Sequence, residues 1–201
     1  MKNSLIFVAL LLLPALVMAE EAPTATGTSP PRVYEIEVIV FQNIQNELEG
    51  NELWTNERIN MELKDIDKAI EVTALPREDS DLTKAREKLD TDSRYRVLVH
   101  KQWIQNADPQ SSARLVRLAS EDGELDGTFK FFISRFLHVN LNLIFLQSGS
   151  KSIFQGAVDN SQQVAYQLRE RRRIRSNEIQ YFDHPKFGVL VQIKKVGIST
   201  N

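Results

Sequence analysis

The chain has 201 residues, of which 25 are lysine or arginine and 27 are aspartate or glutamate, so its formal net charge is −2. This near balance argues against a nucleic-acid-binding protein, because such proteins carry a strong excess of basic residues. The chain contains no cysteine, which excludes thiol catalysis, disulfide bonds and cysteine-ligated zinc. The length suits one domain that is stabilised by a packed core.

The N-terminus has the three zones of a secretory signal peptide. Lys2 supplies a positive charge, an apolar run extends from Leu5 to Val17, and small residues end at Ala19. As a helix this run would span about 20 Å, which is too short for the roughly 30 Å core of a bilayer. We therefore predict that residues 1–19 are a cleaved signal peptide. The mature protein, with no membrane span and no cysteine to carry a lipid, is expected to be free outside the cytoplasmic membrane.

Residues 20–32 are rich in proline and hydroxyl residues, so we predict a flexible linker there and a single domain over residues 33–201. The domain begins with a strand at residues 33–41, in which apolar and polar residues alternate. Residues 42–77 have a weak pattern, and a short helix at residues 56–63 is the one candidate element. Regular structure is expected to resume after this stretch.

A helix is predicted at residues 79–89, because Leu82 shares a face with the apolar residues three and seven positions later. Asp79 or Ser80 can accept hydrogen bonds from its first amide groups. Residues 94–105 then alternate as a strand. The residues expected on one face of this strand are Tyr95, Val97 and Val99. Strand, helix and strand in this order indicate a βαβ-like unit.

A hairpin is predicted next. Its first arm is the strand at residues 113–118, and two turn signals follow, Glu121-Asp122-Gly123 and Asp126-Gly127. Its second arm is the strongest alternation in the chain, at residues 129–145, broken only by Arg135. Because strands average about 5–6 residues, this long arm is expected to contain a bend or bulge, or to serve two regions of a sheet.

Two further strands are predicted near the C-terminus. Alternation restarts at residues 164–176, and after a turn at Asp183-His184-Pro185 it continues at residues 187–195. With the strands above, the sequence predicts an α+β domain with a mostly antiparallel β-sheet of about six strands and one or two helices.

The residues give no positive evidence for catalysis or for a bound metal. The three histidines, His100, His138 and His184, lack the spacing that brings two imidazoles to one metal. Residues 148–151 match the S-x-x-K pattern of serine enzymes, but the K-T-G partner motif is missing. Carboxylates gather in polar loops such as residues 121–126, where solvated turns explain them. We therefore predict a protein that is not an enzyme and has no cofactor.

Arginines alternate along the strand predicted at residues 164–176. If the strand continues to its end, four of them project from one face at intervals of about 7 Å. They are Arg169, Arg171, Arg173 and Arg175. A planar guanidinium group binds a carboxylate through two hydrogen bonds, so this ladder would suit a repetitive anionic ligand or an acidic protein surface. The alternative is that acidic side chains on neighbouring strands neutralise the ladder, since the chain has 27 aspartates and glutamates.

A second candidate feature is the aromatic turn around Asp183-His184-Pro185. Pro185 favours an extended conformation of His184, and Tyr181 with two phenylalanines brackets the turn. The rings are either a structural lock of the turn or a surface on which sugar rings stack. Tyr181 and His184 therefore join the four arginines as candidate ligand-binding residues.

Three blocks of the sequence carry a family resemblance. They are Tyr34–Phe41, Tyr95–Trp103, and Arg172–Glu178 followed by Tyr181–Pro185. In this order they resemble the CsiV family of periplasmic peptidoglycan-binding proteins from Gram-negative bacteria, and the last block is the most distinctive. The resemblance implies a non-enzymatic periplasmic protein that binds the cell wall and supports its synthesis. It also implies a partner, an outer-membrane lipoprotein activator of a class A penicillin-binding protein.

The sequence leaves two functions open. In the leading hypothesis, peptide carboxylates of the wall meet the arginine ladder while aromatic rings contact the glycan. In the alternative, the same face is a protein-protein adaptor for a cell-wall synthase or its lipoprotein activator, without direct wall binding. A wall hydrolase or transferase has the least support, because no nucleophile or metal-binding cluster is evident.

Overall fold

The structure is a computed structural model that describes residues 32–44, 65–72, 77–147 and 164–197, all within one compact unit. Several predictions lie outside these described residues. They are the signal peptide at residues 1–19, the linker up to residue 31, the helix candidate at residues 56–63 and the S-x-x-K match at residues 148–151.

The described residues form eight strands, one α-helix and one short 3-10 helix. Their bounds in chain order are β1 (Val33–Asn43), η2 (Ile66–Lys68), α1 (Asp81–Thr91), β2 (Tyr95–Asn106), β3 (Leu115–Arg117), β4 (Leu125–Ile133), β5 (Leu137–Gln147), β6 (Val164–Ile174), β7 (Ile179–His184) and β8 (Phe187–Lys195). Neither helix in this part of the chain is long and apolar enough to cross a membrane.

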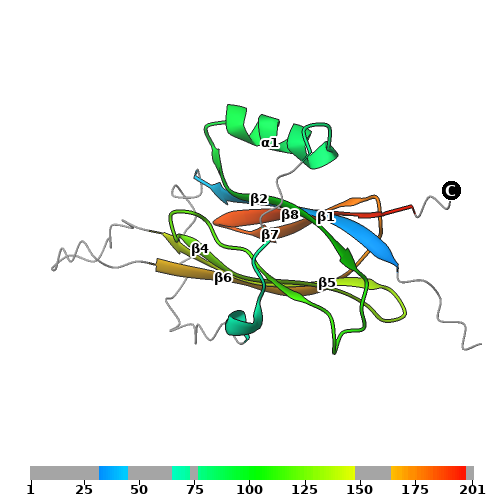
Figure 1. The fold of residues 1–201 in the computed structure, drawn as a ribbon. Coiled ribbons are helices and arrows are strands. Elements are labelled where there is room, and N and C mark those ends of the chain that lie inside the picture. The colour runs from blue at the N-terminus through cyan, green and yellow to red at the C-terminus, as the bar shows by residue number, and fades with distance from the viewer. Residues whose placement is uncertain (1–31, 45–64, 73–76, 148–163, 198–201) are drawn as a thin grey trace, which may run out of the picture. The chain divides into compact units, whose positions relative to one another are not determined.

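The strands form two antiparallel sheets of four strands each. Sheet A has the order β2-β1-β8-β7, and sheet B has the order β3-β4-β5-β6. The sheets pack against each other as two layers, and α1 covers the outer face of sheet A (Figure 1). The prediction of an α+β fold with mostly antiparallel strands is confirmed.

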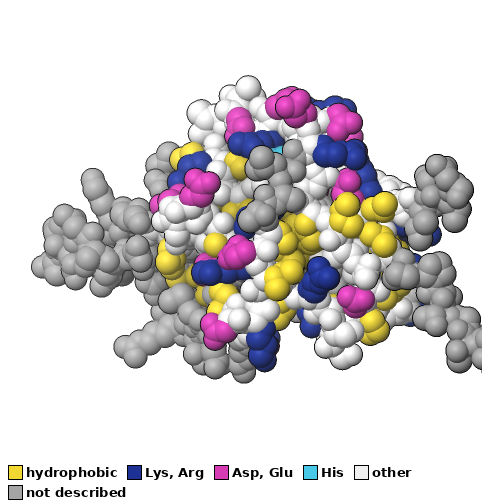
Figure 2. Space-filling view, in the orientation of Figure 1, with side chains coloured by type: hydrophobic (Ala, Val, Ile, Leu, Met, Phe, Trp, Pro, Cys, Tyr) yellow, Lys and Arg dark blue, Asp and Glu magenta, His cyan; other side chains and the backbone are white. Residues whose placement is uncertain are grey.

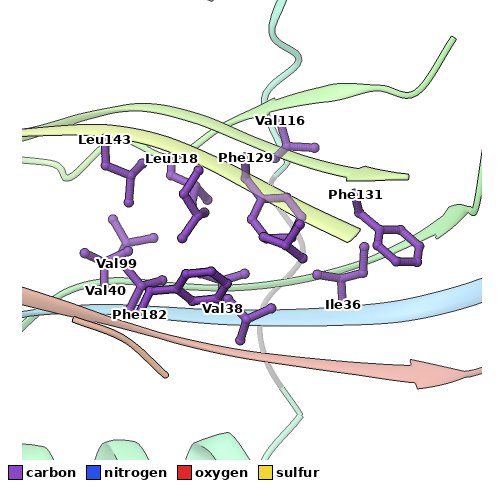
Figure 3. Close-up of a cluster of buried hydrophobic side chains, with 14 of the residues drawn as sticks. Ile36, Val38, Val40, Val99, Val116, Leu118, Phe129, Phe131, Leu143 and Phe182 are labelled. Carbon is purple, nitrogen blue, oxygen red and sulfur yellow. The ribbon is translucent and has the colours of Figure 1, made fainter. Parts of the chain in front are cut away.

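The core lies between the two sheets. Each strand places alternate side chains inward, so Ile36 and Val38 of β1 meet Phe129 and Phe131 of β4 across the interface (Figure 3). The ring of Tyr34 contacts Phe131 edge-on, with ring centroids 5.2 Å apart. Such buried aromatic contacts join the two layers and fix how they pack.

The α1 helix begins at Asp81, directly after one of the two cap residues that the sequence offers. The side chain of its N-cap Ser80 accepts a hydrogen bond from the Thr83 amide at 2.9 Å, which satisfies one free amide of the first turn. Leu82 is fully buried and packs with Ile39 and Phe41 on the outer face of sheet A. The predicted helix is therefore confirmed, with bounds two residues later than predicted, and Ser80 is the N-cap of the two candidates.

The predicted number of about six strands is wrong, because the structure has eight among its described residues. One of the two additional strands comes from the long stretch at residues 129–145, which is divided between β4 and β5 by a turn at residues 134–136. Ile133 and Leu137 pair across this turn of three residues. Odd-numbered residues therefore point into the core on both β4 and β5. The hairpin therefore has the alternation of a single strand.

The other additional strand is β7, which includes the first two residues of the predicted Asp183-His184-Pro185 turn, while the turn itself lies at Pro185-Lys186. Residues 179–184 pair with β8, and only Pro185-Lys186 connects the two strands. A second turn signal, Asp126-Gly127, also lies within a strand, at the beginning of β4. Gly127 is needed there because a Cβ atom would lie 2.2 Å from the backbone oxygen of Asn142. In both places a residue type common in turns serves a pairing strand instead.

The βαβ-like unit is also wrong. β1 and β2 are antiparallel neighbours, so α1 connects antiparallel strands and is not a crossover between parallel ones. The pairing shifts between Val40 and Phe41, which leaves Leu98 of β2 as an extra residue. Because of this bulge, Val97 packs beneath α1 while Val99 points into the core between the sheets. The expectation that they share one face therefore fails.

Candidate binding site

Three of the predicted arginines form a row on the outer face of sheet B. Arg169, Arg171 and Arg173 are exposed on β6, and they alternate with inward residues such as the buried Leu168. We call these three residues the arginine ladder. The strand ends at Ile174, so the fourth predicted member, Arg175, lies one residue beyond it and pairs with Glu178 at 3.6 Å.

The strands beside the ladder present no carboxylate to it. Across β5, the register places Asn142, Asn140 and His138 opposite the three arginines, and on β4 the next positions are Thr128, Lys130 and Phe132. Among the described residues, no member of the ladder forms an ion pair. The one acidic residue of β4 on this face, Asp126, is held by Arg117 through hydrogen bonds of 2.9 and 2.8 Å. The neighbouring strands therefore do not neutralise the ladder.

Aromatic rings support the guanidinium groups of the ladder. Arg171 lies over the ring of Phe132, with its Cζ atom 4.9 Å from the ring centroid. Phe132 also stacks on His138 at 5.1 Å, so its ring is almost fully buried although it belongs to the outer face. Arg173 lies over the ring of Phe136, with its Cζ atom 3.3 Å from the centroid. A stacked guanidinium keeps its N–H edges available for an anion while the ring restricts its motion.

The arginine between the ladder positions has a different role. Arg172 donates to Glu170 at 2.8 Å and to the backbone oxygen of Tyr181 at 2.6 Å, and it lies over the ring of Phe182. These contacts connect β6 of sheet B to β7 of sheet A at the side of the core. Arg172 is therefore satisfied by the fold, unlike the exposed arginines on either side of it.

Tyr181 does not lie with the ladder. It is on the outer face of sheet A, where its ring stacks on Phe41 with centroids 6.3 Å apart, and its hydroxyl donates to Asp183 at 2.6 Å. Burial, together with this hydrogen bond, raises the pKa of Tyr181 above its usual value. Gly188 makes the stacking possible, because a Cβ atom there would lie 2.6 Å from the ring of Phe41 and 2.7 Å from that of Tyr181.

His184 is also separate from the ladder. Its ring lies at the margin of the core, 5.8 Å from the ring of Tyr166 and 4.9 Å from that of Phe187. Nδ1 of His184 accepts a hydrogen bond from the Lys186 amide at 3.2 Å. Burial lowers the pKa of His184 below its usual value. The structure thus brings Arg169, Arg171 and Arg173 together and leaves the two residues of the aromatic turn elsewhere.

A buried polar cluster beneath α1 was not predicted from the sequence. Oε1 of Glu37 accepts hydrogen bonds from Ser80 Oγ and from His100 Nε2, both at 2.7 Å, and all three residues are shielded from solvent. The imidazole contacts the carboxylate and not the serine hydroxyl, so this is not the nucleophile–base contact of a serine hydrolase. The cluster attaches the N-terminus of α1 to sheet A. Figure 2 shows acidic and basic side chains intermingled over the surface that α1 forms.

The residues beside the ladder were visible in the sequence only as a polar face. Lys130, His138 and Asn140 occupy alternate positions of the long stretch that became β4 and β5. Their association with the arginines depends on the pairing of β5 with β6, two strands that residues 148–163 separate in the sequence. Alternation in the sequence identifies the face of each strand but not its neighbour.

The comparisons with known proteins give one match. The model of a family described as "Peptidoglycan-binding protein, CsiV" matches residues 5–196, which is nearly the whole chain. A search of curated proteins and a search of solved structures each found no match. All three sequence blocks that carry the resemblance, and all residues of the arginine ladder, lie within the matched range. The chain therefore belongs to the CsiV family of peptidoglycan-binding proteins.

Proposed function

We propose that this chain is a non-catalytic periplasmic accessory protein that binds peptidoglycan through the outer face of sheet B and supports wall synthesis. The family description supports peptidoglycan as the ligand and binding as the activity. One observation carries the choice of face: Arg169, Arg171 and Arg173 are exposed in a row, with no ion-pair partner among the described residues.

The chemistry of the wall matches this row. Peptidoglycan repeats short peptides along a glycan, and each peptide carries free carboxylates. Guanidinium groups spaced about 7 Å apart on a strand can each take a carboxylate through two hydrogen bonds. Lys130 adds a further cation opposite Arg171 across β5, and Asn140 between them offers an amide to a peptide bond or a sugar hydroxyl. The one acidic residue on this face of β4, Asp126, is paired with Arg117, so it would repel the ligand little.

The proposal is tested by co-sedimentation of the purified protein with isolated sacculi. We expect the wild-type protein to pellet with sacculi, and we expect less of it to pellet as salt is raised, because exposed ion pairs are screened. The double variant Arg169→Gln/Arg171→Gln should bind at least about tenfold more weakly, since charge-assisted hydrogen bonds contribute about 1.5–3 kcal/mol each.

The matched control is Arg86→Gln, which removes one exposed arginine from α1 on the other side of the sandwich. It should bind sacculi as the wild type does. If the double variant keeps its melting temperature and also keeps full affinity and salt sensitivity, the assignment of the face is wrong. If the wild-type protein does not pellet at all, direct wall binding is wrong and the adaptor function replaces it.

We extend the proposal to the partner that the family resemblance implies. An outer-membrane lipoprotein activator of a class A penicillin-binding protein would connect wall binding to wall synthesis. A pull-down with the purified activator, with and without sacculi, tests this step. Capture of the activator only when sacculi are present would indicate co-localisation on the wall, and it would contradict a direct contact between the two proteins.

A further inference from the structure

A pocket of about 390 Å³ lies at one end of the sandwich, where the β4–β5 turn approaches the end of β6. Its lining includes the buried side chains of Tyr34 and Ile174, which belong to the core. Four arginines also line it. They are Arg32, Arg135, Arg173 and Arg175. The pocket is open to solvent and is lined by both apolar and cationic side chains, and its volume falls in the range of small-ligand sites.

The charges around this pocket are unbalanced. Among the described residues that line it, the one carboxylate is that of Glu178, which lies 3.6 Å from Arg175. Among the described residues, Arg135 and Arg173 have no ion-pair partner. The four arginines come from three separate segments of the chain: the residue before β1, the β4–β5 turn and the end of β6. Cations brought together in this way repel one another, and an anion in the pocket would relieve that repulsion.

One exposed ring orients two of these arginines. Phe136 is 37% exposed at the tip of the β4–β5 turn. The Cζ atom of Arg173 lies 3.3 Å from its ring centroid, and that of Arg135 lies 5.4 Å from it. Contact with the ring restricts both guanidinium groups before any ligand arrives, so less conformational entropy is lost on binding. Their N–H edges suit a planar group with two acceptor oxygens, such as a carboxylate.

We propose that this end pocket binds the terminal carboxylate of a peptide stem of the wall, an inference that rests on the proposed peptidoglycan-binding function. Arg173 belongs both to the ladder and to the pocket, so a ligand that follows β6 reaches the pocket at its end. Carboxylates within the ligand can lie along the open ladder. A chain end can enter the pocket, where the apolar lining receives the aliphatic side chain of its last residue and the arginines receive its carboxylate.

The test compares two soluble probes, a stem tetrapeptide with a free C-terminal carboxylate and the same peptide with a C-terminal amide. Calorimetric titration of the purified protein should give at least about tenfold tighter binding of the free acid, because amidation removes one bidentate charged contact. The variant Arg135→Gln should bind the free acid more weakly and lose most of this preference. The control Arg86→Gln should keep both the affinity and the preference.

Equal affinity for the two peptides, no measurable binding of either, or a preference that survives in Arg135→Gln would each overturn the inference. Sacculus co-sedimentation on the same protein preparations separates this failure from that of the proposed function. Sacculi that still pellet the protein leave wall binding intact and remove only the pocket assignment. A variant that no longer melts cooperatively is replaced by Arg135→Lys, which keeps the charge, loses the planar fork and should bind the free acid less tightly than the wild type.

Discussion

The outer faces of the two sheets differ in how their side chains are partnered. On sheet A, Leu82 of α1 covers Ile39 and Phe41, and the buried carboxylate of Glu37 is hydrogen-bonded by its neighbours. On sheet B, the arginine ladder lies exposed beside amides and a lysine, with no carboxylate among those neighbours. The first arrangement satisfies the carboxylate within the fold, although His100 Nδ1 and Gln192 Oε1 beside it have no hydrogen-bond partner among the described residues. The second leaves hydrogen-bonding capacity available for a ligand, and on this difference we base the proposal that sheet B is the binding face.

The comparison predicts that a change beneath α1 affects stability far more than a change on the ladder. Leu82→Ala removes a fully buried side chain from the cluster under the helix and should lower the free energy of unfolding by about 2–5 kcal/mol. Arg171→Ala should change it by less than about 1 kcal/mol, because the side chain is exposed. Urea denaturation of both variants measures the difference. Similar losses in the two variants would contradict the assignment of separate roles.

A smaller effect is expected where α1 is attached to the sheet. Ser80→Ala removes the N-cap hydrogen bond to Thr83 and one of the hydrogen bonds to the buried Glu37. We expect a loss of about 1–2 kcal/mol in the free energy of unfolding, with sacculus binding unchanged. Ser93→Ala, at an exposed serine between α1 and β2, is the matched control and should be nearly neutral. A neutral Ser80→Ala would show that the polar cluster contributes little to holding the helix.

The smallest expected effect concerns pH. Burial lowers the pKa of His184 below its usual value of 6.5, while Asp183 raises it and Lys186 lowers it. As pH falls through 6.5, the unfolded chain takes up the proton more readily than the folded one, so stability decreases below that pH. His184→Gln should remove this part of the pH dependence between pH 8 and pH 5. An NMR titration that gives His184 a pKa of 6.5 or higher would contradict the prediction.

Much of the fold could be predicted from local patterns, because these patterns have local causes. The cap at Ser80 and the buried Leu82 define α1 from neighbouring residues alone. A bend was expected within residues 129–145, but the full turn at residues 134–136 was missed because a turn of three residues leaves the odd-numbered positions pointing inward on both strands. The strand β7 was missed because Asp183-His184-Pro185 has the composition of a turn. These misses changed the strand count without changing the fold class.

The candidate site was predictable only in part. The arginine ladder follows from alternation within one strand, and the structure places three of its four predicted members in a row. The stacking of Arg171 on Phe132 and the association of Arg135 with Arg173 depend on contacts between strands, which alternation does not encode. Tyr181 and His184 are close to the arginines in sequence but belong to sheet A, because the chain changes sheets after β6.

The position of β6 has a further consequence, for the solubility of the protein. β6 is the last strand in the order of sheet B among the described residues, and last strands present backbone groups with which another chain can pair. Charged side chains on such a strand oppose the addition of a second copy, because its arginines would lie beside those of the first. The same row that we propose binds an anionic polymer would thus also oppose self-assembly of the protein through this edge.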